Sequence, residues 1–352
     1  LQRESCHVTN LNLNGNNIGD AGVEHLSHAL QHENCRMTDL YLSGNKIGTT
    51  GVEHLVLALQ HENCRLTNLY GLDDLKLKLT SLKKIKPLLD ANVEKAAARG
   101  EADHEEGEDE EEEAQLEEQG ESKQEQGRVV RTKDLKKAMA ALHDSTVTKL
   151  DVSSISQTSI ARFGAASGVQ KIAEGLQHEN CRVTDLNLHR NKIGRNVEHL
   201  VGALKHENCR VTNLDLRENN IRYQDVEHLK IALQHENCRV TSLNLGGNKV
   251  GDGYDKQGNL VGAGVEHLSH ALEHENCRVT NLSLHGNKIN DAGVERLSRA
   301  LEHENCRVTN LILSGNKVGD AGVEYLSRAL QHENCRMTNL NLGGNKKQIK
   351  PL

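Results

Sequence analysis

The spacing of the cysteines is the feature that most constrains how this chain can fold. Neighbouring cysteines are separated by 29, 29, 117, 28, 29, 39, 29 and 29 residues, and eight of the nine lie in an identical string, HENCR. A period of about 20–50 residues predicts an array of similar units stacked side by side rather than one globular core. The cysteines that mark the period are Cys6, Cys35, Cys64, Cys181, Cys209, Cys238, Cys277, Cys306 and Cys335.

Each unit combines a short strand with a helix, as residues 8–36 (VTNLNLNGNNIGDAGVEHLSHALQHENCR) show. Leu11 and Leu13 alternate with asparagine, which is the period of a strand with one buried face. Asp20 stands at an N-cap position. Apolar residues then recur at helical spacing: Val23, Leu26, Ala29 and Leu30.

A single unit is too small to fold by itself. It buries roughly eight apolar side chains at about 1.5–3 kcal/mol each, whereas ordering its backbone costs about 1–2 kcal/mol per residue. Stacking joins the strands into a parallel sheet and the helices into an outer layer. The sequence therefore predicts an α/β solenoid with the sheet on the concave face and the helices on the convex face.

The composition supports thin, repeated layers. The chain has no tryptophan, one phenylalanine (Phe163) and five tyrosines, so its core must be built from Leu, Val, Ile and Ala. The formal net charge of −7 comes from residues 101–121, which hold thirteen Asp or Glu, and the rest of the chain is mildly basic. Because no dense basic stripe is interleaved with aromatic residues, we expect no nucleic-acid partner. Because we find neither an apolar run of about 18 residues nor a signal-peptide pattern, we expect a cytoplasmic protein with no membrane partner.

The shared pattern LxLxxNxIGDAGVxxLxxAL resembles the ribonuclease-inhibitor-like class of leucine-rich repeats, which includes the repeats of NOD-like receptors and of Ran GTPase-activating protein. Recognisable units begin at Val8, Met37, Leu66, Val147, Val183, Val211, Val240, Val279, Val308 and Met337. The resemblance implies that the asparagine after the second leucine binds the turn backbone and forms a ladder along the solenoid. The matching residues are Asn16, Asn45, Asn191, Asn219, Asn248, Asn287, Asn316 and Asn345.

The pattern predicts three parts: leucine-rich repeats at 1–70, an insertion at 71–132, and further repeats at 133–352. The unit that begins at Leu66 ends early, because Gly71 stands where its second strand leucine belongs. We interpret the insertion as splitting one repeat, and an error in the gene model is the alternative.

The insertion itself begins with a basic helical stretch and continues with the acidic run EADHEEGEDEEEEAQLEEQGE. Residues 99–128 hold too little apolar surface to order themselves, so we expect disorder there. The run lacks the D-x-D-x-D-G loop of a calcium site, so a solvated linker is favoured over a site for calcium or a basic partner. The chain begins at Leu1 and stops in mid-pattern at Leu352, and we expect a fragment of a longer protein.

Two residue types raise the question of a metal site. Each repeat offers a single cysteine rather than a CxxC pair, so reduced, buried thiols are favoured and we expect no metal or cofactor. Two helices carry three histidines at i, i+3 and i+7, where imidazoles on one face can chelate zinc: His25, His28 and His32, and His267, His270 and His274. Other repeats replace the middle histidine by Leu57, Ile231, Arg299 and Arg328, so the triads are incidental to the repeat.

Catalysis has no sequence support. None of GxSxG, HExxH or GxxxxGK[ST] occurs, so we predict that the chain is not an enzyme. The resemblance to Ran GTPase-activating protein supplies an alternative, because Arg190 and Arg217 follow strands and positive charge there can stabilise phosphoryl transfer on a small GTPase. The acidic segment is internal here rather than following the repeats, which weakens the match.

We predict that the chain binds a partner protein on its concave face. Polar positions around the strand leucines project from that face and vary while the rest of the unit is nearly constant. The best anchors there are Tyr41, Tyr70, His189, Arg190, Asp215, Arg217, Glu218, His285 and Ile312. Two alternatives remain open: the sensor repeats of a NOD-like receptor fragment, and a recently duplicated array without a selected partner.

Overall fold

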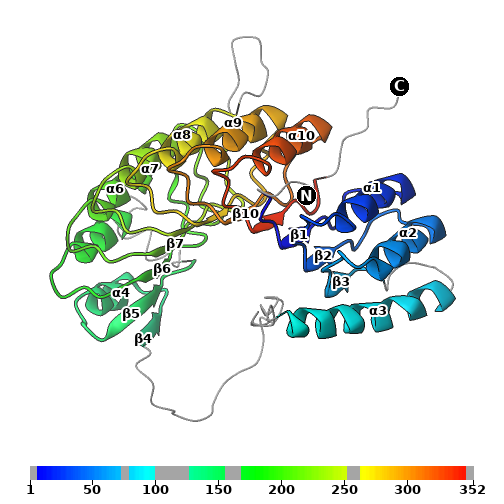
Figure 1. Cartoon of the computed structure of the whole chain (residues 1–352). Helices are drawn as coiled ribbons and strands as arrows, with labels where there is room; N and C mark the ends of the chain where they lie inside the picture. The colour runs from blue at the N-terminus through cyan, green and yellow to red at the C-terminus, as the bar shows by residue number, and fades with distance from the viewer. Residues whose placement is uncertain (1–5, 73–78, 100–126, 155–167, 252–261, 346–352) are drawn as a thin grey trace.

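A single curved parallel sheet of eleven strands forms the inner face of the molecule, with helices outside it (Figure 1). The computed structural model describes residues 6–72, 79–99, 127–154, 168–251 and 262–345. The strands are β1 (Asn10–Asn12), β2 (Asp39–Tyr41), β3 (Asn68–Tyr70), β4 (Arg128–Arg131), β5 (Val147–Asp151), β6 (Asp185–Asn187), β7 (Asn213–Asp215), β8 (Ser242–Asn244), β9 (Asn281–Ser283), β10 (Asn310–Ile312) and β11 (Asn339–Asn341). The predicted solenoid is confirmed.

The outer layer consists of one helix per repeat over most of the molecule. The α-helices are α1 (Asp20–Leu30), α2 (Thr49–Gln60), α3 (Leu79–Ala98), α4 (Leu135–Leu142), α6 (Glu198–Leu204), α7 (Val226–Leu233), α8 (Ala263–Leu272), α9 (Asp291–Leu301) and α10 (Asp320–Ala329), with a 3-10 turn η1 (Gly194–Val197) before α6. Residues 168–176 are also helical. The core lies between the sheet and this layer, and it is built almost entirely from Leu, Val, Ile, Ala and Cys.

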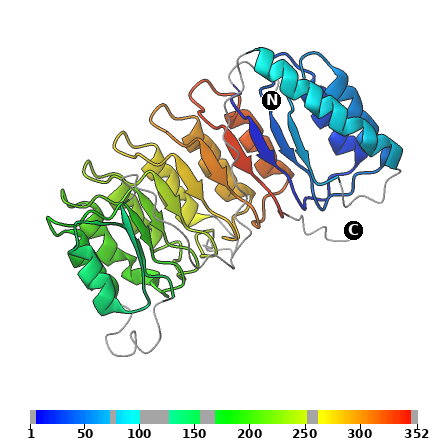
Figure 2. The ribbon, with the colours of Figure 1, turned by 90° about the horizontal axis from the view of Figure 1, so that it is seen from below.

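The order of the strands does not follow the chain. In the sheet the order is β3-β2-β1-β11-β10-β9-β8-β7-β6-β5-β4, so the first repeat stacks on the last one. At this contact, which we call the β1–β11 junction, Leu11 pairs with Leu340 and Asn12 with Asn341. Figure 2 shows the N-terminal strands continuing the C-terminal sheet without a change of direction. We call residues 6–72 and 79–99 the N-terminal block, and the described residues from 127 to 345 the C-terminal block.

This order corrects the interpretation that an insertion splits one repeat. The strands on either side of the predicted insertion are β3 and β5. β3 forms one edge of the sheet and β5 lies next to the opposite edge, so the two cannot belong to the same repeat. The physical reason is that the repeats are nearly identical in sequence. The edge of β11 can therefore pair with β1 in the same way as strands of other neighbouring repeats pair with each other. The blocks are therefore joined through the sheet at the β1–β11 junction.

Two elements lie inside the segment predicted as an insertion. Helix α3 packs against α2, where Ile85 is buried and Asn92 Nδ2 donates to the carbonyl of Leu66 at 3.0 Å. Strand β4 pairs with β5 and forms one edge of the sheet. Residues 100–126, which include the acidic run, lie outside the described residues. The division at 71 and 132 stays a prediction.

The eight asparagines of the expected ladder lie in one row behind the turns. Asn248 is typical: its Nδ2 donates to the carbonyls of Leu216 and Leu245 (both 2.9 Å), and its Oδ1 accepts from the N–H groups of Asn219 (2.9 Å) and Ile221 (3.0 Å). Each side chain thus satisfies buried backbone groups of two neighbouring repeats. The row continues through the β1–β11 junction, where Asn345 N–H donates to Asn16 Oδ1 at 3.0 Å.

The HENCR string forms a second ladder at the other end of the helices. The N–H of Asn305 donates to His303 Nδ1 at 3.2 Å, and Asn305 Nδ2 donates to the carbonyl of Glu273 in the preceding repeat at 3.0 Å. The same bond to the preceding repeat recurs from Asn63, Asn208, Asn237, Asn276 and Asn334. These asparagines bind carbonyls that the last helical turn leaves without intrahelical partners. The string is therefore a helix-end connector.

All nine cysteines are free and buried between the helical layer and the sheet. Burial raises the pKa of Cys209, Cys277 and Cys306 to about 11. A thiol with such a pKa is almost fully protonated at neutral pH and is a poor nucleophile and metal ligand. The cysteines behave as small apolar core residues.

Candidate binding face

One side chain from every strand projects from the concave face, at the position between the paired apolar residues. In sheet order these residues are Tyr70, Tyr41, Asn12, Asn341, Ile312, Ser283, Asn244, Asp215, Asn187, Asp151 and Arg131. All of them are at least partly exposed, whereas the strand leucines beside them are mostly buried. The row is continuous, so a partner can contact side chains from both blocks at once.

An aromatic pair occupies the end of the row in the N-terminal block. The rings of Tyr41 and Tyr70 stack with centroids 4.4 Å apart and an interplanar angle of 13°. Tyr70 is 42% exposed, so an aromatic surface remains open to a partner. We call these two residues the tyrosine pair.

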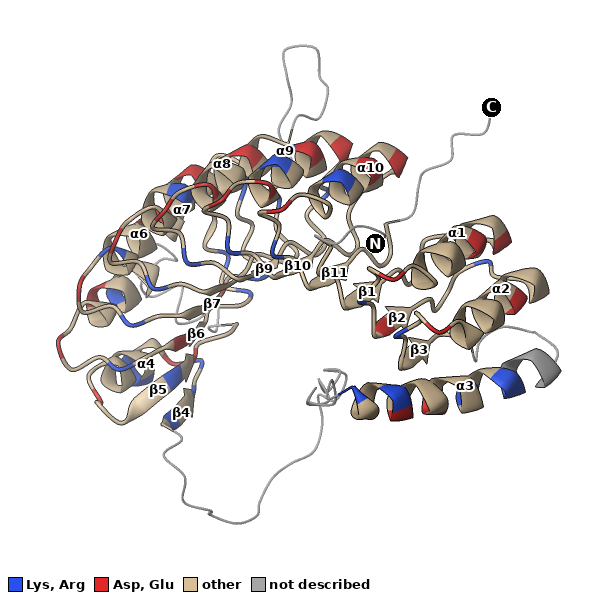
Figure 3. Ribbon diagram, viewed as in Figure 1, with Lys and Arg blue, Asp and Glu red and all other residues tan. Residues whose placement is uncertain are grey.

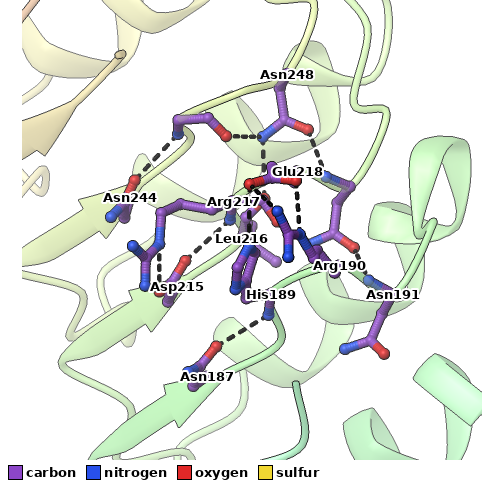
Figure 4. A network of polar contacts seen from close by, with 12 residues as sticks. Asn187, His189, Arg190, Asn191, Asp215, Leu216, Arg217, Glu218, Asn244 and Asn248 are labelled. Carbon is purple, nitrogen blue, oxygen red and sulfur yellow. Dashed lines mark hydrogen bonds and ion pairs between the residues drawn. The ribbon is translucent and has the colours of Figure 1, made fainter. Parts of the chain in front are cut away.

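A charged network occupies the turns after β6 and β7, in the other block (Figure 4). Arg190 binds Glu218 through two contacts, Nε to Oε2 at 2.7 Å and Nη2 to Oε1 at 3.1 Å, and His189 Nε2 lies 3.3 Å from Glu218 Oε1. Arg217 Nη2 lies 2.8 Å from Asp215 Oδ2 in the adjoining ion pair. We call these five residues the charged network. The arrangement joins two consecutive repeats.

The backbone of the charged network is in an unfavourable conformation. Arg190 and Glu218 have φ values of 58° and 52°, in the left-handed region where the equivalent residues of other repeats are glycines, such as Gly247. A residue with a side chain costs of order 1 kcal/mol there. Glycines in the next repeat also make room, because a Cβ added to Gly247 would lie 2.8 Å from Glu218 Cγ.

The network is electrically balanced. The hydrogen bond from Arg190, assisted by a weaker one from His189, lowers the pKa of Glu218 against the opposing effect of desolvation. Both arginines face a carboxylate, and strands β4 to β7 carry acidic and basic residues side by side (Figure 3). The surface therefore suits a partner with both charge signs rather than a uniformly charged one.

The nine predicted anchors do not form one patch. Six strand spacings of about 4.8 Å put the tyrosine pair roughly 29 Å along the sheet from Asp215. Ile312 and His285 lie between these ends, and His285 Nδ1 is 2.9 Å from Ser314 Oγ. Sequence reasoning missed Arg131 and Asp151, which extend the charged end. The Lys-Leu-Asp-Val alternation at 149–152 was a usable signal for Asp151, whereas β4 lacks leucine.

Within the described ranges, no three His, Cys, Asp or Glu side chains come together as a metal site. The described helices include none that is both long and apolar enough to cross a bilayer.

The family comparison agrees with this architecture. A family model described as "Leucine Rich repeat" matches residues 4–27, 33–56, 236–253, 275–298 and 304–327. The chain is built from leucine-rich repeats. The matches fall in both blocks, so the repeats on either side of the β1–β11 junction are of one type.

Two solved structures are similar to this chain. The leucine-rich repeat-containing protein LegL7 from Legionella pneumophila is 17% identical, with 84% of this chain and 90% of that chain covered and a TM-score of 0.35. An internalin (inlF) from Listeria monocytogenes is 16% identical, with 98% and 83% covered and a TM-score of 0.24. None of the curated proteins matches the sequence.

Proposed function

We propose that this leucine-rich-repeat chain is a non-enzymatic scaffold that binds a partner protein on its concave face. Leucine-rich-repeat proteins generally serve as protein-interaction scaffolds. The observation that carries the proposal is the charged network, in which Arg190 and Glu218 replace glycine in strained turns. Strain retained on an exposed surface favours a role in recognition over a role in packing.

The partner we propose makes two separate contacts. An apolar or aromatic group stacks on the tyrosine pair, and a segment with both charge signs reaches the charged network. Because the two ends lie roughly 29 Å apart along the curved sheet, the partner is a folded protein or a long segment rather than a short peptide.

Two further assignments belong to this proposal. The repeat of about 29 residues with a helix on its convex side supports the ribonuclease-inhibitor-like class. Nine free cysteines favour a reducing compartment such as the cytoplasm. The GTPase-activator alternative gains no support from the site, because Arg190 and Arg217 are held by Glu218 and Asp215. The NOD-like-receptor alternative stays a prediction.

A pull-down from lysate of the source cell tests the proposal with three variants. One removes the tyrosine pair (Tyr41→Ala with Tyr70→Ala), and one converts the network to the glycines of other repeats (Arg190→Gly with Glu218→Gly). The control is Leu57→Ala, a 59% exposed residue on the convex face of α2. We expect a protein retained by the control and lost from both concave variants. Equal retention by all three would overturn concave-face binding.

A further inference from the structure

A cavity of about 350 Å³ lies on the convex side of the molecule, between the neighbouring helices α8 and α9 (Figure 1). Three carboxylates and two guanidinium groups are among the side chains that line it. Arg296 Nε lies 3.2 Å from Glu266 Oε2, and Arg299 pairs with Glu295 of its own helix. The third carboxylate, that of Glu273, makes no ion pair or hydrogen bond with any described residue. The cavity therefore has one negative charge that its own arginines do not balance.

Ser269, one helical turn before Glu273, is the buried polar residue of this cavity. It is 3% exposed, and its Oγ has no hydrogen-bond partner among the described residues. Ser298, at the same place in α9, is equally buried (3%) and lacks a partner in the same way. Buried hydroxyl groups normally have at least one hydrogen-bond partner. An unpartnered one in the wall of a cavity indicates a place for a ligand group.

The equivalent serine of α1 shows how this hydroxyl is satisfied elsewhere in the solenoid. Ser27 Oγ donates to the carbonyl of His54 at 2.7 Å and accepts from Gln31 Nε2 at 3.2 Å. Gln31 stands one helical turn after the serine, where α8 has Glu273 and α9 has Glu302. A carboxylate has no N–H to donate. The replacement thus removes the donor and puts a negative charge in its place.

The two combinations of serine and glutamate lie on adjacent helices, because α8 packs against α9 and α9 against α10. We call Ser269 with Glu273, and Ser298 with Glu302, the serine–glutamate pairs. Among the described helices, only α8 and α9 carry this combination. In α10 a glutamine again follows the serine, and its Nε2 donates to the serine Oγ at 3.4 Å. The unpartnered serines therefore coincide with the glutamates.

A primary ammonium group has the chemistry that each pair calls for. It donates N–H groups to the serine hydroxyl and to the carboxylate together, and its charge balances that of the glutamate. It is compact, like the single amide NH2 that occupies this place in α1, whereas a guanidinium group is wider and planar. A divalent cation fits less well, because the described residues place no three ligating side chains together.

We propose that the two serine–glutamate pairs bind the two ammonium groups of a linear diamine or polyamine. Packed helices lie about 8–10 Å apart, which sets the separation of the two ammonium groups. The cavity volume of about 350 Å³ is that of a site for a small ligand. The site lies on the convex side and stands apart from binding of a protein on the concave face.

The probe is heptamethylenediamine, titrated into the full chain by calorimetry at low ionic strength. Its two ammonium groups can reach both pairs, whereas putrescine carries the same charges on a shorter chain and can reach only one pair. We expect saturable binding of heptamethylenediamine with a Kd below about 1 mM. Putrescine should bind at least about tenfold more weakly, because the second contact is then lost.

Two matched double variants separate the site from the general acidity of the chain. Glu273→Gln with Glu302→Gln restores the glutamine of α1 and should weaken binding of heptamethylenediamine at least about tenfold. Glu275→Gln with Glu304→Gln removes the same two charges at exposed positions of the HENCR strings and should leave the Kd unchanged. Circular dichroism checks that both variants are folded.

A second double variant tests the hydroxyl groups without changing the charge. Ser269→Val with Ser298→Val introduces the residue that α2 and α6 carry at this position, Val56 and Val201, so the fold tolerates it. We expect binding to weaken at least about fivefold, because the ammonium groups lose their hydroxyl acceptors.

Three results would overturn the proposal. The first is no saturation up to about 10 mM heptamethylenediamine. The second is equal binding by the Glu273→Gln, Glu302→Gln variant and its control, which would place the diamine on other acidic residues. The third is equal affinity for putrescine or for N-acetyl-lysine amide, because single ammonium groups, such as those of lysines in a partner protein, would then be what the pairs recognise.

Discussion

The β1–β11 junction and the ordinary boundary between β9 and β10 are alike in the sheet and different in the helical layer. Both pair three residues in the same parallel register, and both continue the inner asparagine ladder. At the ordinary boundary, α9 also packs on α10, and Asn334 Nδ2 donates to the carbonyl of Glu302 at the end of α9. At the junction the described residues contribute no such helix pair.

The difference separates two sources of stability that a complete repeat combines. The strand side supplies register, backbone hydrogen bonds and buried leucines, and among the described elements it alone pairs the two blocks. The helix side adds apolar burial, so a boundary without it is the weakest interface in a solenoid that behaves as a sum of neighbouring contacts. We expect the junction to open before any other described boundary.

The largest expected effect comes from breaking the junction directly. Residues 1–99 and 127–352, produced as two separate chains, should associate one to one, because β1 pairs with β11 without a covalent link. Leu11→Asp should lower that affinity by more than about 1000-fold, since it places an unpaired charge in a buried position. Calorimetry measures the affinity, and Asn17→Asp, at an exposed residue of the same repeat, is the control. Two pieces that never associate would show that β1 does not recognise β11.

Much of this fold is predictable from local sequence. Leu11 and Leu13 fix the strand, and Asp20 to Leu30 fix the helix, because both patterns repeat at short range. The order of the blocks is not predictable in this way, because near-identical repeats fit one another equally well in several orders. The ladder of the HENCR asparagines escaped prediction for a similar reason: its bond joins residues 31 to 42 apart, and only the constancy of the string marked it.

The candidate site was predictable in its members but not in their grouping. Arg190 and Glu218 stand 28 residues apart at one repeat position, so their proximity follows from the period. The glycines at equivalent positions indicate the left-handed backbone that the structure gives both residues. The distance between Tyr41 and Asp215 depends on the strand order, so the sequence could not show that the anchors form two clusters.

A second prediction compares the inner ladder at the two kinds of boundary. Asn219 is fully buried and binds the carbonyls of Leu188 and Arg217, so Asn219→Ala should lower the free energy of unfolding by about 2–4 kcal/mol. Asn16 at the junction is partly exposed, and Asn16→Ala should cost only about 1–2 kcal/mol because water can replace its bonds. Urea unfolding measures both. Equal losses would show that the junction is as well shielded from water as the interior.

A third prediction uses the cysteines as reporters of opening. Cys6 and Cys335 lie on either side of the junction, whereas Cys277 lies inside the C-terminal block. If the junction opens first, Cys6 and Cys335 should react with iodoacetamide at least about tenfold faster than Cys277 under native conditions. Mass spectrometry of the labelled peptides gives the three rates. Matching rates at all three sites would mean that the solenoid opens as one unit.

The smallest expected effect concerns the charged network, which strengthens the boundary between β6 and β7 and has no counterpart among the described contacts of the junction. Arg190 lowers the pKa of Glu218 in the folded chain below its ordinary value of 4.5. The ionised form is therefore the one that folding favours. Its contribution is complete above about pH 4.5 and is lost as the pH falls through the lower, folded-state pKa.

Glu218→Gln isolates this contribution because it keeps the backbone conformation and a hydrogen-bonding side chain. Since the pair is about half exposed, the difference in unfolding free energy from the unaltered chain should be no more than about 0.5 kcal/mol at neutral pH. It should shrink toward zero as the pH falls through the lowered, folded-state pKa of Glu218, because the unaltered carboxyl then becomes protonated in the folded chain as well. Urea titrations at neutral pH and at a series of acidic pH values measure it. A difference that stays constant between them would show that Arg190 stabilises the turn by packing rather than by charge.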